Sequence, residues 1–544
     1  MTEKIKLKIE HLRHELPTKA EWIFLCVILG VLYVSFASGD LLVTGNRSFL
    51  YYDGFFEFYT NSFEVTGGYG ANYLPSTFIL FAIWNLPLYL LGRMPLDILD
   101  SSLVNVMWYK LLPIIAYFLS AHLLEKIALE VGFGEKKAKL CKYAFLVCPI
   151  GVYGQFIFGQ YDSFTVLCML LGILYYLKGD WKRFVLFFGL AITFKYHALI
   201  YFMVLLLLKE KKVLRVLSQL ILCCMVPAVE VLLYIKDDNF IKSVFGFTAL
   251  DKVSGGLQIG AFGSTNLMLI VSLLLFMWAY VTETTNKENL FKWGVFLCSG
   301  VSFVFFGLCT WHPQWLVMMV PFLVLSTLIN KYGKIFLLLE NVFIIAFYVL
   351  ISTLFVCIAD QALFLQGVFK YALIDTGFTM NMSEVYVYDD VSMLSSCIMG
   401  ILLIFFLFNH PKYHLLDVKE VGQDIVGNMR LLFCVGILAF VIPAGICLFK
   451  VLDGERIVYC VTGEEVVQSV PLMEGNVVQQ YFIADVDNIV KVEIPFGTYE
   501  RINNASFTVR IREKDSSDII YEKIINMAEV VDNNDMYTVI DEDI

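Results

Sequence analysis

The sequence predicts an α-helical multi-pass membrane protein with a small β-sandwich-like domain outside the membrane at its C-terminal end. The chain has 544 residues, is 58% hydrophobic and only 17% charged, and has a mean hydropathy of +0.71. Apolar runs of about 17–25 residues recur, which is the length that crosses a hydrocarbon core of roughly 30 Å. After Asp453 the composition changes, and short, partly alternating runs replace the long apolar stretches.

The net charge of −10 comes from this C-terminal part. From Asp453 onward there are nineteen acidic and seven basic residues, which leaves a charge of about +2 on everything before it. The acidity therefore belongs to one domain, and no nucleic-acid partner is expected. Twelve of the thirteen cysteines lie in or beside apolar runs, as small buried hydrophobic residues do, and only Cys460 lies in the water-soluble part. No disulfide framework or Cys-x-x-Cys metal site is predicted.

Three short clusters of basic residues determine the expected topology. They are Lys136, Lys137, Lys139 and Lys142; Lys178, Lys182 and Arg183; and Lys209, Lys211, Lys212 and Arg215. Short loops rich in lysine and arginine stay on the cytoplasmic side of a membrane. With all three inside, the chain must reach the outer side and return between each pair. Gln160-Tyr161-Asp162 and Lys195-Tyr196-His197 are then expected near the outer side.

The N-terminal region is expected to lead into the membrane and then form a long outer loop. Residues 1–20 are basic and cytoplasmic, and Trp22–Ala37 is the first crossing, an uncleaved start-transfer segment. Residues 38–102 form the outer loop. Within it Ser76–Leu91 is apolar enough to span, but it is rich in proline, and counting it would place the Lys136 cluster outside. We therefore expect a helix that lies along the outer interface.

The next part of the chain is expected to contain a broken helix. Three crossings precede it: Val104–Leu124, Leu140–Phe158 and Ser163–Leu177. The apolar stretch Phe184–Leu208 follows and is interrupted by Lys195-Tyr196-His197. As one straight helix it would bury Lys195 about 18 Å deep and place the Lys209 cluster outside. Two half-helices that turn at 195–197 are predicted instead.

The remaining segments complete the membrane domain, residues 21–452. They are Val213–Ile235, Asn266–Val281, Trp293–Thr310, Leu316–Ile329, Ile335–Ile358, Met393–Phe408 and Leu431–Phe449. With the broken pair counted as two, about thirteen segments are expected in the plasma membrane, some of them short. The chain then ends outside.

Residues 453–544 are predicted to form an extracytoplasmic antiparallel β-sandwich. The expected strands are Val477–Phe482, Ile489–Ile494, Ser506–Ile511 and Asp518–Ile524. The last residues, 541–544, follow no obvious closing strand, as in a truncated domain.

The outer loop contains the first candidate catalytic residues, Asp40, Asp53 and Glu57. If the stretch around Asp53 is helical, Asp53 and Glu57 are four residues apart on one face. Two such carboxylates can serve as a general base and as a ligand for a metal ion or substrate. The aromatic residues beside them suit sugar binding. The alternative is an interfacial amphipathic helix with a solvated acidic face.

Two further polar stretches lie at predicted helix ends. Gln160 and Asp162 come between an exiting and a re-entering helix, where Asp162 or Ser163 could also be a helix cap. Lys195 and His197 interrupt an apolar run, and ionisable residues at membrane depth are usually functional. A cation there fits a phosphate-bearing substrate. A snorkelling lysine at a helix end is the alternative.

A third polar stretch is Trp311-His312-Pro313-Gln314-Trp315. His312 can donate a hydrogen bond to a phosphate or take part in proton transfer. The alternative is an aromatic belt at the interface, in which Pro313 starts a helix.

The order of these features resembles the GT-C class of integral-membrane glycosyltransferases, which use polyprenyl-phosphate-linked sugars. The stretches that resemble the acidic loop and the Tyr/Pro-containing helix of that class are 53–61 and 72–75. The stretches 159–163, 194–195 and 312–314 resemble bacterial mannosyltransferase-like members. The likeness covers roughly residues 20–330. It departs from the usual Tyr-Pro-Pro at Tyr73-Leu74-Pro75.

The resemblance implies inverting transfer of a mannose-like hexose, at the outer face, to a glycan, lipid or protein acceptor. Asp53, or alternatively Asp40, would deprotonate the acceptor hydroxyl. Lys195 and His312 would stabilise the departing lipid phosphate, and Gln160 and Asp162 would orient the acceptor or a divalent cation. No cofactor is predicted, and a divalent metal stays an open alternative.

Two other functions compete with this one. A transporter or flippase of lipid-linked saccharides would show broken helices in matching positions of two halves, whereas the sequence predicts one break, near Lys195. A non-enzymatic envelope assembly protein would use the β-rich domain and would leave that break without a role.

Overall fold

The computed structural model divides the chain into two units, described separately below. The helical unit comprises 1–372 and 380–449, and the second unit 373–379 and 450–544. The structure describes residues 17–66, 70–95, 98, 101–246, 257–258, 264–354, 363–364, 366–373, 382–386, 388, 390–416, 423–452, 473, 475, 477–479, 491–494, 504–513, 518–530 and 537–541.

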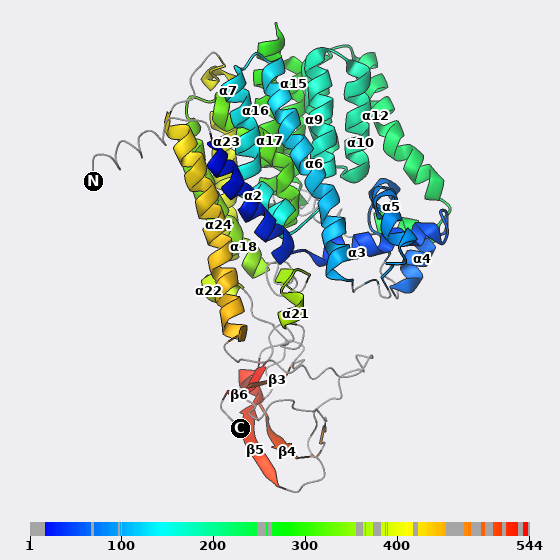
Figure 1. The fold of residues 1–544 in the computed structure, drawn as a ribbon, viewed down its shortest axis with the longest axis vertical. Coiled ribbons are helices and arrows are strands. Elements are labelled where there is room, and N and C mark those ends of the chain that lie inside the picture. Colours follow the sequence, from blue (N-terminus) through cyan, green and yellow to red (C-terminus); the bar gives the residue numbers. More distant parts are fainter. Residues whose placement is uncertain are drawn as a thin grey trace, which may run out of the picture. The chain divides into compact units, whose positions relative to one another are not determined.

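Within these residues, six helices are long and apolar enough to cross a membrane (Figure 1). They are α6 (Leu103–Glu130), α12 (Val213–Tyr234), α16 (Lys287–Leu308), α18 (Gly333–Leu354), α23 (Val391–Phe408) and α24 (Gln423–Leu452). Two bent pairs raise the number to as many as eight. This supports a multi-pass membrane protein, while the thirteen predicted segments are not confirmed.

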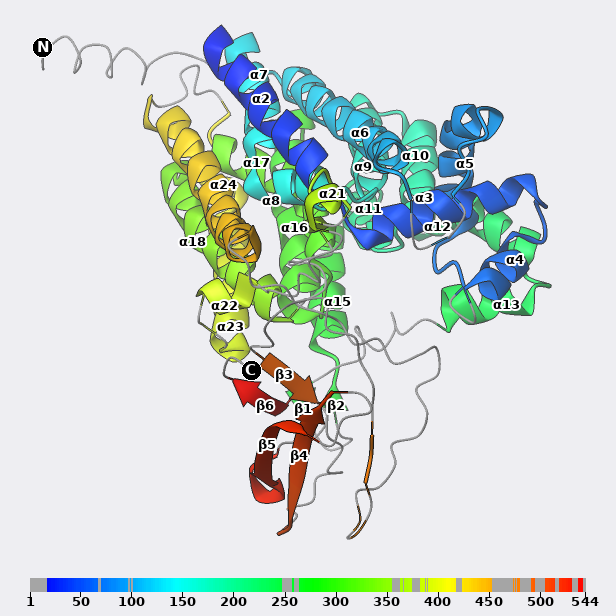
Figure 2. The same ribbon diagram turned by 60° about the horizontal axis from the view of Figure 1, so that its bottom comes forward.

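The two bent pairs break where the sequence stops a helix. In the first, α2 (Lys19–Ser35) is followed by α3 (Gly39–Arg47) and the 3-10 turn η1 (Ser48–Tyr52), at an angle of 70°. Ser38 caps α3 by accepting a hydrogen bond from the Leu41 N–H. Figure 2 shows α3 running away from the direction of α2.

In the second pair, α7 (Glu135–Val147) is followed by α8 (Pro149–Val152) and the π-helical turn η2 (Tyr153–Ile157), at 51°. Cys148 precedes Pro149 and is extended, as the proline ring requires of its preceding residue.

Several predicted crossings are helices of 10–16 residues. They are α9 (Ser163–Lys178), α10 (Trp181–Phe194), α11 (Ala198–Lys209), α15 (Leu267–Val281), and α17 (Val320–Ile329) after the 3-10 segment η4 (Pro313–Met319). At 1.5 Å per residue, the sixteen residues of α9 span about 24 Å. The predicted interfacial segment forms α5 (Pro75–Leu90), with Pro87 inside it. At the start of α5, the N–H and the hydroxyl of Ser76 donate hydrogen bonds to Glu230 of α12.

The predicted break at Lys195–His197 is confirmed. Helix α10 ends at Phe194, Lys195 is extended, and α11 starts at Ala198. The two helices form a hairpin. In it the ring centroid of Phe202 lies 5.0 Å from that of Phe184 and 5.6 Å from that of Phe188.

The basic clusters lie where α6, α9 and α11 end and where α7, α10 and α12 begin. The Lys209 ammonium donates to the carbonyl of Tyr176, near the end of α9, at 2.7 Å. Lys287, at the start of α16, pairs with Glu130 at the end of α6 at 2.6 Å. Helices α6, α9, α10 and α12 pack in this order. The turns that contain Asp162 and Lys195 therefore lie at the ends of α9 and α10 that are opposite to the basic clusters.

The remaining short elements are α4 (Phe58–Val65), α13 (Asp238–Phe240), η3 (Ile241–Phe245), α21 (Lys370–Leu373), α22 (Met382–Tyr386), η5 (Pro411–Tyr413), and the strands β1 (Leu257–Gln258) and β2 (Ser264–Thr265). A buried cluster that includes Leu41, Phe49, Phe81, Tyr109 and Tyr161 joins α3, η1, α5 and α6 to the turn before α9. This core fixes the position of the turn.

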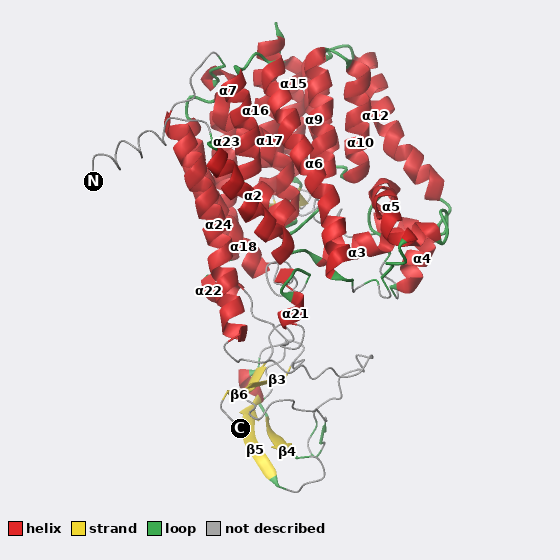
Figure 3. Ribbon diagram, in the orientation of Figure 1, coloured by secondary structure: helices red, strands yellow, loops and turns green. Residues whose placement is uncertain are grey.

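Within its described residues, the second unit contains two antiparallel strand pairs (Figure 3). Strand β3 (Lys491–Ile494) pairs with β6 (Tyr537–Asp541), and β4 (Ser506–Arg512) pairs with β5 (Ile519–Asn526). Three predicted strands are thus found within a few residues, and a β-sandwich is not confirmed. Strand β6 lies where no closing strand was expected. For the remaining predicted strand, Val477–Phe482, residues 477–479 are not in a strand, and 480–482 lie outside the described residues.

Candidate functional site

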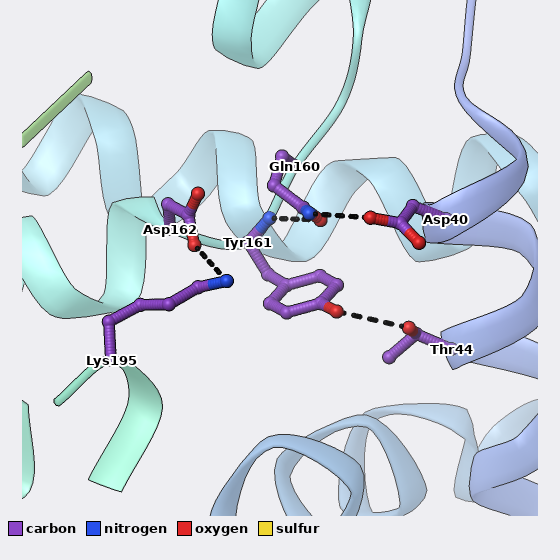
Figure 4. Close-up of polar contacts among 6 residues, drawn as sticks. All are labelled: Asp40, Thr44, Gln160, Tyr161, Asp162 and Lys195. Carbon is purple, nitrogen blue, oxygen red and sulfur yellow. Dashed lines mark hydrogen bonds and ion pairs between the residues drawn. The ribbon is translucent and has the colours of Figure 1, made fainter. Parts of the chain in front are cut away.

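Three breaks between helices bring polar side chains together at one place. They are the α2–α3 break, the turn between η2 and α9, and the α10–α11 turn. Figure 4 shows Asp40 and Thr44 from the first, Gln160, Tyr161 and Asp162 from the second, and Lys195 from the third.

The centre of the site is an ion pair between Lys195 and Asp162. The ammonium nitrogen lies 3.1 Å from a carboxylate oxygen, and the two side chains are only 4% and 0% exposed. Asp162 stands at the N-cap position of α9, but its side chain makes no capping hydrogen bond. Its carboxylate is therefore directed to Lys195, and the alternative of a simple cap is not found. Ser163 donates to the carbonyl of Pro113 instead.

Three aromatic rings surround the Lys195 ammonium. The ring centroids of Tyr73, Trp315 and Tyr161 lie 4.4, 5.4 and 5.9 Å from it. They come from three different segments, and the negative faces of such rings attract a cation. Because the ammonium is buried among these rings and paired with Asp162, Lys195 does not snorkel to a surface in this structure.

A hydrogen-bond chain connects Asp40 to the same turn. Asp40 lies in the first turn of α3 and is exposed. The Gln160 amide nitrogen donates to its carboxylate at 3.1 Å, and the Gln160 amide oxygen accepts from the Tyr161 N–H at 3.2 Å. The hydroxyls of Tyr161 and Thr44 are 3.2 Å apart. Two contacts thus fix the 160–162 turn to α3, and Asp40 and Asp162 lie on either side of Gln160.

Asp53 and Glu57 are placed differently. Asp53 follows η1, Glu57 directly precedes α4, and both are exposed in the connection between them. The two residues therefore do not share one helix face. The contacts that join the three breaks do not include either of them.

His197 follows Lys195 by two residues, and Gln314 directly precedes Trp315, whose ring lies near the Lys195 ammonium. The His197 ring packs between those of Phe305 and Trp315, with centroids 4.1 and 4.9 Å apart. Within the described residues, neither His197 nitrogen has a hydrogen-bond partner, nor does the Gln314 amide oxygen, and both side chains are buried. Buried polar groups are normally hydrogen-bonded, so these atoms are available to a ligand. His312 packs on Trp315 at 5.0 Å.

The sequence interpretation missed Lys110, which is completely buried in α6. It donates to backbone carbonyls of α2 and η2. A lysine in the middle of an apolar run was the available signal, because such residues are usually functional.

The described residues contain no group of three or more His, Cys, Asp or Glu side chains placed to hold a metal ion. Asp40 and Asp162 are the two carboxylates that the site offers to a cation. Lys195 already balances the charge of Asp162.

No protein family, curated protein or solved structure matches the chain. The chemistry of the site is therefore the guide to its function. An ammonium group can bind a phosphate, and a nearby exposed carboxylate can accept a proton from a hydroxyl. Together these groups suit transfer from a phosphate leaving group to a hydroxyl acceptor.

Proposed function

We propose that this protein is a membrane glycosyltransferase that moves a hexose from a polyprenyl-phosphate donor to an acceptor hydroxyl at the outer face. The observation that carries the proposal is the meeting of Lys195, Asp162 and Asp40 from three separate helix breaks. Breaks and buried charges are both costly in a membrane and are retained mainly where they have a function.

The depth of Lys195 supports a lipid-linked donor. Helix α10 has fourteen residues, so Lys195 lies about 21 Å from the start of that helix beside the basic clusters. If the start of α10 lies at the inner surface of a hydrocarbon core of roughly 30 Å, this position is past the midplane and below the opposite surface. A phosphate attached to a lipid can reach this depth while its chain stays in the bilayer.

In the proposed reaction, Asp40 takes the proton of the acceptor hydroxyl, and the oxygen bonds to the anomeric carbon from the face opposite the phosphate. The bond between that carbon and the phosphate oxygen breaks, which inverts the anomeric configuration. Lys195 stabilises the negative charge on the departing polyprenyl phosphate. Gln160 holds Asp40, and Asp162 holds Lys195 until the donor binds.

Asp40 is proposed as the base in place of Asp53 because Gln160 joins it to the turn that contains Asp162. His197 and Gln314 are proposed to contact the donor, since their polar atoms beside Trp315 have no hydrogen-bond partner in the described part of the chain. Tyr73 and Trp315 would move or tilt to admit the phosphate, because they now enclose the ammonium.

The test is transfer of radiolabel from a panel of polyprenyl-phosphate sugars in membranes that contain the protein. Membranes with the Lys195→Met variant are the matched control. Labelled product with the wild type but not with the variant supports the proposal. No product from any donor in the panel, with stable protein present, contradicts it.

A transporter of lipid-linked saccharides is the second candidate. The further breaks at α2–α3 and α7–α8 bring it into consideration, because discontinuous helices are typical of transporters, but these breaks all lie in the first half of the chain and not in matching positions of two halves. Movement of a labelled lipid-linked sugar across proteoliposomes, without transfer to any acceptor, would favour it over the transferase.

A further inference from the structure

Lys110 is a buried lysine whose hydrogen-bond acceptors are all backbone carbonyls. It lies in α6 with no exposed surface, and its amino nitrogen lies 5.4 Å from the centroid of the Tyr33 ring. Its ammonium donates to the carbonyls of Leu32 (3.4 Å), Tyr33 (2.8 Å), Phe36 and Phe156 (2.7 Å). An ammonium has three N–H donors, so these carbonyls satisfy it fully.

These carbonyls belong to two of the three breaks. Those of Leu32, Tyr33 and Phe36 are at the C-terminal end of α2, where the last carbonyls have no partner inside the helix and carry partial negative charge. The carbonyl of Phe156 is in the π-helical turn η2. Lys110 therefore caps the end of one broken helix and simultaneously binds the end of another.

The backbone that follows α2 and the backbone that follows η2 then lie side by side next to the candidate site. The Ser38 N–H donates to the Phe158 carbonyl at 2.9 Å. Asp40 lies two residues beyond Ser38, Gln160 lies two residues beyond Phe158, and their side chains meet at 3.1 Å.

Gly159 shows how closely the lysine stem fits this junction. Its φ is +80°, and a Cβ atom there would lie 3.2 Å from both Cγ and Cε of Lys110 and 3.1 Å from Leu41. A side chain at this position would therefore strain the backbone and push against the stem.

We infer that Lys110 is a positioning residue, which locks the α2–α3 break to η2 and so sets the separation between Asp40 and Gln160. The consequence for catalysis rests on the transferase function proposed above, whereas the consequence for geometry does not. A role only in overall stability would leave that separation unchanged in any variant that still folds.

The geometry is tested by cross-linking. Cysteines replace Asp40 and Gln160 in the full-length protein, and a short bifunctional thiol reagent joins them. Mass spectrometry identifies the 40–160 product, so the native cysteines stay in place. We expect the product in the parent protein and its loss in Lys110→Met, at a temperature where thermal unfolding shows both to be folded.

Trp108→Phe is the matched control. It lies on the same helix and removes a hydrogen bond to the Trp84 carbonyl of α5, which is not among the carbonyls that Lys110 binds. It should keep the cross-link. Gly159→Ala perturbs the junction from the opposite side and should lose it, so an undiminished cross-link in this variant still overturns the inference if Lys110→Met does not fold. Undiminished cross-linking in a folded Lys110→Met or Gly159→Ala, or equal loss in Trp108→Phe, overturns the inference.

Activity gives a second readout, in the protein that retains Asp40 and Gln160. Misplacing a reacting group by about 1 Å can cost on the order of 100-fold in rate, so Lys110→Met should lower kcat by about that factor and leave the donor KM unchanged. If the wild type transfers no sugar, the proposed function fails, and the cross-linking result still decides the role of Lys110.

Discussion

The ion pair between Lys195 and Asp162 allows a quantitative prediction. Asp162 has a fully buried side chain, and apart from Lys195 its carboxylate oxygens have no hydrogen-bond partner within the described residues. Lys195→Met would leave this charge without compensation, since methionine keeps the volume of the stem but not the ammonium. Breaking a buried pair in this way costs about 3–5 kcal/mol.

The double variant Lys195→Met/Asp162→Leu should cost much less than the two single variants together. Replacing both partners of a buried ion pair by apolar residues is often close to neutral. We therefore expect a coupling energy of about 3 kcal/mol between the two positions, at the upper end of the range for residues in contact. Lys182→Met, at an exposed position, is the control and should change stability by no more than about 0.5 kcal/mol.

The measurement is the free energy of unfolding in detergent micelles for the wild type, both single variants and the double variant. Additive losses would refute the reasoning, because they would mean that the two charges do not stabilise each other. Titration with a polyprenyl-phosphate analogue then separates stability from function. Lys195→Met should lose binding and Lys195→Arg should keep part of it, whereas equal affinity in all three proteins would exclude Lys195 as a phosphate ligand.

Three further predictions concern the site and the topology. Asp40→Asn should abolish transfer, since an amide cannot take the acceptor proton, while Asp53→Asn should keep it; the opposite result in the radiolabel assay would return the base to Asp53. Cysteines placed at Lys136 and Lys211 should resist a membrane-impermeant thiol reagent added from outside, and strong labelling would reverse the proposed orientation. Tyr73→Phe should keep the wild-type unfolding free energy, while Tyr73→Leu should lose about 0.5–2 kcal/mol with the cation–π contact; equal losses would assign the effect to the hydroxyl.

The helix break at Lys195 could be predicted because two local signals agreed. Charged residues interrupted an apolar run, and the basic clusters required the chain to turn back there. The pairing of Asp40 with Gln160 had no such signal, since it joins residues 120 positions apart through the 70° bend after α2. The shared face of Asp53 and Glu57 depended on the stretch being helical, and the Asp53-Gly54 pair is itself a turn signal against a helix.

The number of membrane segments and the C-terminal strands show a similar limit. Apolar runs and basic clusters predicted thirteen segments, with the two halves of the broken pair counted separately. Helices α10 and α11 have only fourteen and twelve residues, so such a count includes passages of the chain that are not full-length spans. Strand β6 was missed although its Thr-Val-Ile core has high strand propensity. Its partner β3 lies more than forty residues earlier, and neither strand indicates that pairing by itself.

Lys110 both stabilises the helix breaks and affects the site that the breaks form. Backbone that leaves a helix inside a membrane must find new partners, because lipid provides none. For the carbonyls of Tyr33 and Phe156 those partners are the N–H groups of one lysine side chain, which reaches both breaks from α6. A carboxylate in that place would repel the same carbonyls, and an apolar residue would leave them unpaired. The lysine that stabilises the two irregular turns is therefore also the residue that we infer to hold Asp40 beside Gln160. The stability of the breaks and the geometry of the site then have a common physical origin.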